Sequence, residues 1–309
     1  MGETVEMIDL HAHILPDLDD GAETVEEALE MCRVSYKDGT KTIVATPHIL
    51  PGIYENDRST ILSKLQELNE AIKKFGVESS EFRVKNFDST TQRPKDPTHA
   101  MTQRPNDLIT QLPNDSMTKL KILPGADVHF TADVLHRCKR KEILTVNDNG
   151  KYLMIEFAFQ GIPYQAEEVL FHLIAAGIVP IITHPERNLE IGQRPQRYLR
   201  MIQMGCLGQV TAMSLTGGFG PAVKKVAGKL LTKRLLHIIA SDAHSIDRRP
   251  PILSAAVGVA EKMVGKEEAY KMVTDYPQAV LDGKKPNVPE PPLSLTNREG
   301  REKVIELFS

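Results

Sequence analysis

Short apolar runs alternate with amphipathic segments along most of the chain. Runs of four to ten apolar and β-branched residues predict strands, and apolar positions three or four residues apart predict helices. The predicted strands are residues 5–10, 41–46, 120–129, 152–157, 178–183, 207–211 and 236–241. The predicted helices include residues 24–37, 58–75 and 165–176. This alternation predicts an α/β fold in which crossover helices connect parallel strands.

One polar segment, Glu81 to Lys119, interrupts the pattern. It contains a loose repeat, Thr-Gln-Arg-Pro at 91–94 and again at 102–105, followed by Thr-Gln-Leu-Pro at 110–113. Low hydrophobicity with recurring proline favours an inserted loop that need not be ordered over a solenoid, which requires longer repeats with a buried face.

Composition narrows the possible partners and the compartment. The chain has 309 residues, 41% of them hydrophobic, which suffices for one full core, and its formal net charge is -3. This charge argues against a basic surface for nucleic acid or an anionic membrane. The N-terminus shows no secretory pattern, and no run approaches the length of a spanning helix, so we expect a soluble cytoplasmic protein.

The three cysteines do not form a disulfide framework or a zinc knuckle by their spacing. None is followed six positions later by the arginine that closes the phosphate loop of a thiolate phosphatase. We therefore interpret them as buried structural thiols.

Polar residues follow the predicted strands where each strand ends. His11 and His13 leave the first strand, and residues of a strand that are two apart point to the same side. His48 follows the second strand. Because parallel strands of a barrel place their carboxyl ends at one rim, such residues meet there, and imidazole with carboxylate is a transition-metal ligand set. The histidines at this rim are His11, His13, His48, His184 and His244, and the carboxylates beside them are Asp127, Glu156 and Asp242.

Two acidic features have alternative explanations. The turn that contains Asp17, Asp19 and Asp20 is consistent with metal ligands or with capping of the following helix. Glu156 interrupts an apolar strand, and an unpaired buried carboxylate is costly, so we expect it to bind metal, form an ion pair or lie at the mouth of the strand.

Taken together, these motifs resemble the polymerase and histidinol phosphatase (PHP) superfamily. The order is I-D-x-H-x-H, D-D-G, T-P-H, G-A-D, I-E-F, H-P-E-R and S-D-A-H with R-R-P-P. Within the superfamily they resemble the manganese-dependent protein tyrosine phosphatases of bacterial capsule and exopolysaccharide operons, the CpsB/YwqE type. The resemblance runs from Met7 to about Asp282. It implies a distorted (β/α)7 TIM-like barrel in a single domain over 1–285, followed by a C-terminal tail over 286–309.

The resemblance also implies a site with three metal ions, most simply manganese, with iron or zinc as alternatives. The first ion would be held by His11, His13, Asp127 and Asp242, the second by Asp127, Glu156 and His184, and the third by Asp20, His48 and His244. Arg187 and Arg249 match the phosphate-binding arginines of the family, whereas Arg248 occupies a position that is often small. The bridging position, usually Glu in the family, is Asp127 here.

The expected reaction is hydrolysis of phosphotyrosine by a metal-bridging hydroxide, with the arginines holding the phosphate oxygens. The implied partner is the tyrosine-rich tail of a bacterial tyrosine kinase. Two other functions stay open, a small-molecule phosphatase acting on a compound such as histidinol phosphate, and a metal-dependent non-enzymatic partner of a polysaccharide export complex. The segment Glu26 to Arg33 is either a solvated helix face or a contact in a homo-oligomer.

Overall fold

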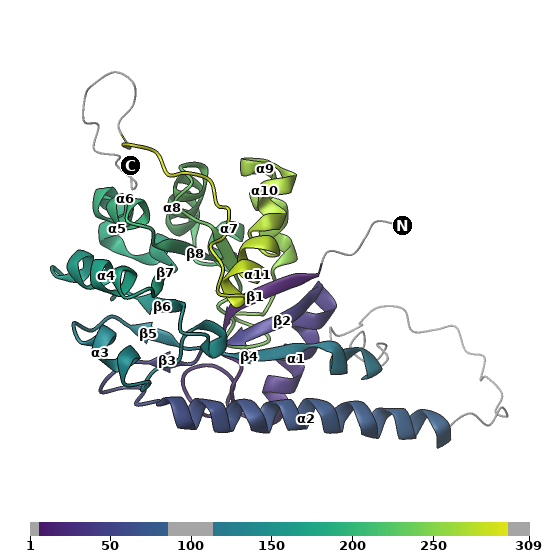
Figure 1. Cartoon of the computed structure of the whole chain (residues 1–309). Helices are drawn as coiled ribbons and strands as arrows, with labels where there is room; N and C mark the ends of the chain where they lie inside the picture. Colours follow the sequence, from purple (N-terminus) through teal and green to yellow (C-terminus); the bar gives the residue numbers. More distant parts are fainter. Residues whose placement is uncertain (1–5, 86–113, 296–309) are drawn as a thin grey trace.

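Short parallel strands alternate with helices in the computed structural model, which describes residues 6–85 and 114–295 (Figure 1). The strands are β1 (Met7–Ala12), β2 (Thr40–Ala45), β3 (His48–Ile49), β4 (Lys121–Pro124), β5 (Asp127–His129), β6 (Tyr152–Glu156), β7 (Val179–Thr183), β8 (Leu207–Thr211) and β9 (Ile238–Ala240). The α-helices are α1 (Val25–Asp38), α2 (Arg58–Lys85), α3 (Val134–Lys139), α4 (Ala166–Ala175), α5 (Leu189–Gln193), α6 (Gln196–Gln203), α7 (Ala212–Thr216), α8 (Pro221–Thr232), α9 (Ser254–Val264), α10 (Lys266–Lys271) and α11 (Asp275–Leu281). Short 3-10 helices are η2 (Asn114–Lys119), η3 (Val146–Asp148) and η4 (Pro185–Arg187). The predicted α/β class is confirmed.

The strands form two parallel sheets, ordered β1-β2-β4 and β3-β5-β6-β7-β8-β9. The predicted strand over 120–129 is wrong as one element, because the chain bends at Gly125 and passes from the first sheet to the second. A Cβ on Gly125 would lie 2.6 Å from Val44 Cγ1, so only glycine allows this close approach. The chain also passes from the first sheet to the second between β2 and β3, at Thr46 and Pro47.

The first strand also meets the segment that follows the last strand. Asp242 donates its backbone N–H to the carbonyl of His11 at 2.8 Å, and His13 donates to the carbonyl of Ala243 at 2.8 Å. Ala12 and Ala243 form an isolated parallel bridge. Residues 11–13 and 242–244, far apart in sequence, therefore lie side by side.

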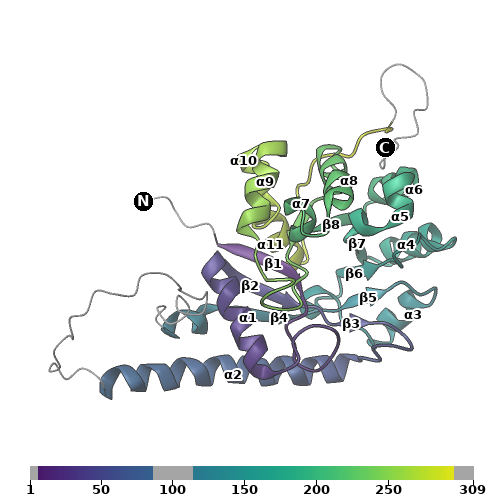
Figure 2. The same ribbon diagram turned by 180° about the vertical axis from the view of Figure 1, so that it is seen from behind.

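Helices cover the outside of both sheets. In Figure 2, α1 and α2 lie together beside β2 and β4, and α4, α5 and α6 lie beside β6 to β8. Thr24 caps α1 by accepting the N–H of Glu27, and Gly39 ends it with a left-handed backbone at φ 108°. Among the described residues, no helix combines the length and the apolar character that a membrane crossing requires.

Helix α2 is longer than the sequence predicts. The predicted end at Phe75 is wrong, since the helix continues past Gly76 to Lys85. A glycine inside a helix costs only about 1 kcal/mol, which a long helix tolerates. Of the predicted insertion over 81–119, α2 thus includes 81–85 and η2 includes 114–119, while residues 86–113 lie outside the described residues.

Side chains alternate between two apolar clusters, and this alternation positions the candidate site. Tyr152 and Met154 of β6 and Ile181 of β7 belong to the smaller cluster. Helix α11 contributes Val280 and Leu281 to the same cluster. Glu156 lies two residues after Met154, and Thr183 lies two residues after Ile181. Their side chains therefore point to the same side of the sheet as the smaller cluster. The polar rim therefore sits directly on the small inner cluster, at the carboxyl ends of the strands.

Candidate metal centre

The structure brings all nine candidate ligands to one rim, although His48 and Asp127 begin the short strands β3 and β5 and do not end a strand as expected. They come from β1, the turn after it, β3, β5, β6, and the segments after β7 and β9, and they are His11, His13, Asp20, His48, Asp127, Glu156, His184, Asp242 and His244. His11, His13 and Asp127 are fully buried, and Asp242 is 1% exposed. Only the Asp20 side chain is half exposed. The ligands therefore line a site that opens to solvent on the side of Asp20.

The first group surrounds His11. Its Nε2 atom lies 3.0 Å from His13 Nε2. It also lies 3.6 Å from Asp127 Oδ2 and 3.6 Å from Asp242 Oδ1. Two ligand atoms of one ion at metal distances of about 2.1 Å are themselves about 3.0 to 3.5 Å apart in octahedral or tetrahedral geometry. These four side chains thus have the spacing of one coordination shell.

A second group surrounds the same oxygen of Asp127. His184 Nε2 lies 3.7 Å from Asp127 Oδ2 and 3.5 Å from Glu156 Oε1. His48 Nδ1 lies 3.6 Å from Asp127 Oδ2 and 3.7 Å from Glu156 Oε2. Asp127, although one methylene shorter than Glu, therefore reaches both groups.

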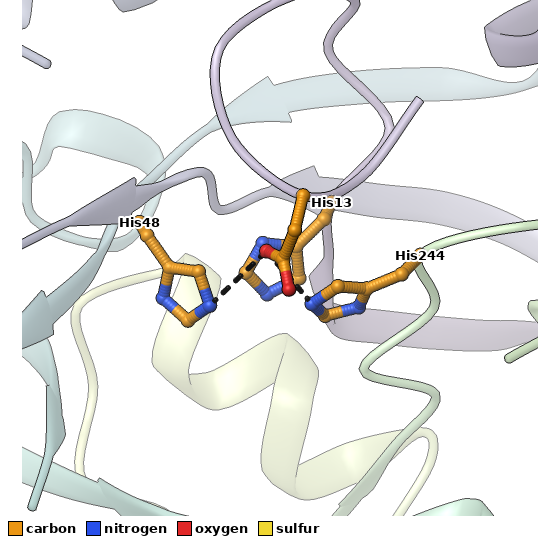
Figure 3. Close-up of side chains that lie close together, drawn as sticks. His13, His48 and His244 are labelled. Carbon is orange, nitrogen blue, oxygen red and sulfur yellow. Dashed lines mark ion pairs between the residues drawn. The ribbon is translucent and has the colours of Figure 1, made fainter. Parts of the chain in front are cut away.

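A third group lies on the open side of the rim, where His13, His48 and His244 converge (Figure 3). Asp20 Oδ1 lies 3.6 Å from His48 Nε2 and 3.4 Å from His244 Nε2. His13, Asp20, His48 and His244 each offer one atom, and these atoms lie within 4.8 Å of one another. The grouping differs from the expected one in two residues, because His13 also faces the third group and the two nitrogens of His48 face different groups.

Several of these atoms have no hydrogen-bond partner within the described part of the chain. They are Asp127 Oδ2, His48 Nδ1, His184 Nε2 and His244 Nε2, all buried. Buried polar atoms are nearly always paired with protein, water or an ion. His48 Nδ1 and His184 Nε2 both face Asp127 Oδ2, while His244 Nε2 faces Asp20 Oδ1. These unpaired atoms fit cation ligands, since bound cations would satisfy them.

Electrostatics support the same interpretation. Burial, reinforced by nearby positive groups, lowers the pKa of His11 to about 3 and of His48 to about 4, so both imidazoles are neutral at pH 7. Burial and the charge of Glu156 raise the pKa of Asp127. His13 differs, because Asp19 and Asp242 outweigh burial and raise its pKa to about 10. Neutral imidazoles beside crowded carboxylates make an environment that favours a divalent cation, which would displace the proton of His13.

Other polar groups orient the ligands, and the sequence did not single out most of them. Gln209 Oε1 lies 2.9 Å from His11 Nδ1, and Asp19 Oδ2 lies 2.6 Å from His13 Nδ1. The hydroxyl of Thr183 donates to Asp127 Oδ1 at 3.1 Å, and that of Thr211 donates to Asp242 Oδ2 at 3.0 Å. Such contacts fix the ring and carboxylate orientations at metal sites. Alternation along the strands could have identified three of them in the sequence. Thr183 of β7 and Gln209 and Thr211 of β8 occupy the alternate positions whose side chains point to the rim.

The acidic turn does not cap the following helix, which was one of its two expected roles. Thr24, rather than an aspartate, caps α1, while Asp19 accepts the backbone N–H of His48 at 2.8 Å. The turn therefore serves the rim.

Two candidate ligands have a left-handed backbone, His184 at φ 34° and Asp242 at φ 51°. This conformation is uncommon outside glycine and costs on the order of 1 kcal/mol or more. His184 directly follows β7 and Asp242 lies two residues after β9, and the conformation turns their side chains toward the rim.

The two candidate arginines meet at one carboxylate. Arg187 Nη2 lies 3.1 Å and Arg249 Nη2 lies 2.7 Å from Asp242 Oδ2. The Phe219 ring lies 5.2 Å from Arg187 Cζ and 5.7 Å from Arg249 Cζ. Arg248 is exposed. Two partly buried guanidinium groups thus flank the carboxylate that also lies near His11 and His13.

His129 is a further residue that the sequence did not suggest. It pairs in register with Glu156 across β5 and β6, and its Nδ1 atom lies 3.7 Å from Glu156 Oε2. The side-chain contact with His129, together with His184 and His48, outweighs burial and lowers the pKa of Glu156 to about 2. Glu156 is thereby ionised across the neutral range.

The fold and the rim define an α/β protein with a candidate centre for several metal ions. The chain belongs to the capsular polysaccharide synthesis family CpsB/CapC, whose model matches residues 7–84 and 89–282. It is 31% identical over 275 residues to the tyrosine-protein phosphatase YwqE of Bacillus subtilis (strain 168), covering 89% of this chain and 91% of that protein. It is 34% identical over 249 residues to CapC of Staphylococcus aureus, covering 80% of each chain.

A solved structure has the same fold. It comes from work on YwqE of Bacillus subtilis and CpsB of Streptococcus pneumoniae, described as unique metal-dependent tyrosine phosphatases. The match has a TM-score of 0.76 at 30% identity and covers 92% of this chain and 98% of that chain. The family resemblance expected from the motifs is confirmed.

Proposed function

We propose that this protein is a metal-dependent protein tyrosine phosphatase that regulates capsular or exopolysaccharide synthesis. The observation that carries the proposal is the position of Asp127 Oδ2, 3.6 Å from His11 Nε2 and 3.7 Å from His184 Nε2. One carboxylate oxygen between two ligand groups suits a bridge between two ions. The similarity to YwqE and to the structure described as a metal-dependent tyrosine phosphatase supports the choice of reaction.

We assign the ligands in three sets, with manganese as the first choice of metal and iron or zinc as alternatives. His11, His13, Asp127 and Asp242 form the first set. Asp127, Glu156 and His184 form the second, and Asp20, His48 and His244 form the third. These residues would hold divalent ions, which would supply hydroxide near neutral pH by lowering the pKa of bound water.

The protein's own residues bind and orient the phosphate. Arg187 and Arg249 present guanidinium forks to the phosphate oxygens, and bidentate contacts match their geometry. Asp242 holds both arginines in place, since they contact one of its oxygens at 3.1 and 2.7 Å. The phenolate of tyrosine is a good leaving group, with a pKa near 10, and needs no strong acid.

We also infer that the two sheets are halves of one distorted (β/α)7 barrel. The hydrogen bonds that link residues 11–13 to 242–244 and the bends at Pro47 and Gly125 support this inference. The proposed domain is 1–285, with the tail over 286–309. Within that tail, Gln203 of α6 donates to the carbonyl of Pro292 at 2.9 Å, so its first residues lie against the domain.

The proposed partner is a phosphotyrosine protein, specifically the tyrosine-rich tail of a bacterial tyrosine kinase, and the proposed compartment is the cytoplasm. These proposals rest on the family resemblance. For Glu26 to Arg33 of α1, a solvated helix face and a contact in a homo-oligomer both stay predictions.

The test compares two substrates with the manganese-loaded protein. We expect a higher kcat/KM for a phosphotyrosyl peptide than for histidinol phosphate. The reverse order would favour a small-molecule phosphatase. If ions bind but no phosphate is released from either substrate or from any aryl ester, the enzymatic proposal fails in favour of a binding role.

A further inference from the structure

A cavity of about 230 Å³ lies beside the rim at the ends of β6 and β7. One wall carries charged and metal-binding groups, Glu156, His184 and Arg187. The other wall is apolar and includes Phe157, Phe159 and Ile191. A cavity with a few polar groups at one end and an apolar body is the usual form of a small-molecule subsite.

Phe159 is unusual on this wall because its side chain is 56% exposed. An exposed aromatic ring on a surface loop has no role in the core, in contrast to Phe157, which is 5% exposed and packs against Phe130 at 5.5 Å between ring centroids. Phe159 therefore offers apolar area to whatever enters the cavity.

The loop that carries Phe159 is hydrogen-bonded to α5 and to Asn188, the residue before this helix. Leu189 donates its N–H to the carbonyl of Phe159 at 2.9 Å, and Asn188 Nδ2 donates to the carbonyl of Ala158 at 2.8 Å. Further along, Ile162 donates to Glu190 Oε2 at 2.9 Å. The backbone of the apolar wall is thus fixed relative to η4, which carries Arg187, so the two walls keep their spacing before a ligand binds.

We propose that this cavity holds the phenyl ring of an aryl phosphate, with the phosphate at Arg187 and His184 and the ring against Phe159. The inference rests on the proposed function and adds Phe159 as a specificity-determining residue for it. It also places the leaving group toward the end of β6, where Glu156 and Phe157 line the cavity.

Selectivity for aryl over alkyl phosphates follows from this placement. A phosphoserine side chain lacks a ring and leaves the Phe159 face without a partner. Aromatic pairs add about 0.5 to 1.5 kcal/mol beyond area burial, which corresponds to about twofold to tenfold in affinity.

The test uses the full-length, manganese-loaded protein with Phe159→Ala, Phe159→Leu and Phe171→Ala. Phe171, on α4, is also 56% exposed but does not line the cavity, so it is a matched control. Substrates are phosphotyrosyl and phosphoseryl peptides of one sequence. Calorimetry with phenylphosphonate and methylphosphonate measures binding without turnover.

We expect Phe159→Ala to raise KM for the phosphotyrosyl peptide about twofold to tenfold with little change in kcat. It should weaken phenylphosphonate by the same factor and leave methylphosphonate, inorganic phosphate inhibition and the phosphoseryl peptide unchanged. Phe159→Leu should be intermediate, and Phe171→Ala should match the unmodified protein.

Equal weakening of both phosphonates by Phe159→Ala, or no change in either, would overturn the inference. Failure of the proposed function gives a different result. In that case no aryl ester is hydrolysed. Phenylphosphonate binding that is weakened by Phe159→Ala would still support the ring site, and binding that does not depend on Phe159 would overturn it.

Discussion

The Nε2 atoms of His11 and His13 lie 3.0 Å apart, at the distance expected for two ligands of one ion. Both also lie near the same oxygen of Asp242, at 3.6 and 3.5 Å. This arrangement depends on the link between residues 11–13 and the segment after β9, because Asp242 donates its N–H to the carbonyl of His11. The H-x-H motif alone places the rings on one side, and the closing contact supplies the third ligand.

Replacing Asp127 should remove two ions at once. Asp127 Oδ2 lies between two ligand groups, whereas Asp20 belongs to the third group, beside His48 and His244. Asp127→Asn should therefore lower the metal content measured by elemental analysis by two equivalents and the activity by at least about 100-fold. Asp20→Asn should lower the content by one equivalent. Loss of the same single equivalent from both variants would contradict the bridging role.

Asp19 should act through His13. Its Oδ2 atom lies 2.6 Å from His13 Nδ1, and partners of this kind typically contribute 10- to 100-fold to metal affinity. Asp19→Asn should raise the metal dissociation constant by about that factor without unfolding the protein. Asp17→Asn, an exposed change in the same turn, is the control and should have no effect. Equal affinities for the two variants would show that Asp19 does not support the site.

Much of the site could be predicted from the sequence because strand ends follow from local pattern. The run 178–183 and the motif that begins at His184 placed that residue correctly, since apolar strands and the polar residue after them are adjacent in the chain. The barrel argument predicted that residues 11–13 and 242–244 share a rim. It did not predict the hydrogen bonds that join them directly, since those depend on contacts between distant segments.

The misses have the same physical origin. The bend at Gly125 depends on the approach of Val44, which no local pattern encodes. Likewise Gln209 has the appearance of a single polar residue in a strand until the fold places it 2.9 Å from His11. The sharing of His13 and His48 between ligand groups depends on ring orientation, which the sequence does not specify.

The two arginines should contribute geometry as well as charge. Arg187→Lys and Arg249→Lys retain the charge but lose the bidentate fork, and a hydrogen bond to a charged group is worth about 1.5 to 3 kcal/mol. Each variant should raise KM for an aryl phosphate and the inhibition constant of inorganic phosphate about tenfold to 100-fold. Arg248→Lys, at the exposed neighbouring position, should behave like the unmodified protein. If all three variants are indistinguishable, neither arginine binds the phosphate.

Acid should destabilise the fold through His237, a buried residue outside the rim. Burial lowers its pKa from 6.5 to about 4, and its Nδ1 atom accepts the N–H of Gly208 at 3.0 Å. Between these two pH values the unfolded chain binds more protons than the folded chain, so the free energy of unfolding rises with pH up to about 6.5. The His237 contribution is complete above pH 6.5 and is lost as the pH falls toward 4, by up to about 3 kcal/mol.

Denaturant unfolding at several pH values measures this contribution. His237→Asn keeps an acceptor for Gly208 and should flatten the dependence between pH 4 and 6.5. His172→Asn, on an exposed position of α4, should retain the full dependence. An unchanged slope in His237→Asn would show that other groups cause the acid sensitivity.

The most direct test of the metal-dependent phosphatase is phosphate release from a phosphotyrosyl peptide by metal-stripped protein, with and without added manganese. His11→Ala and Arg249→Ala are measured alongside, because the first removes a ligand and the second a phosphate-binding group. We predict release that requires manganese and is lost in both variants. Manganese binding without release from any aryl ester, or equal release by the metal-stripped protein, would contradict the account.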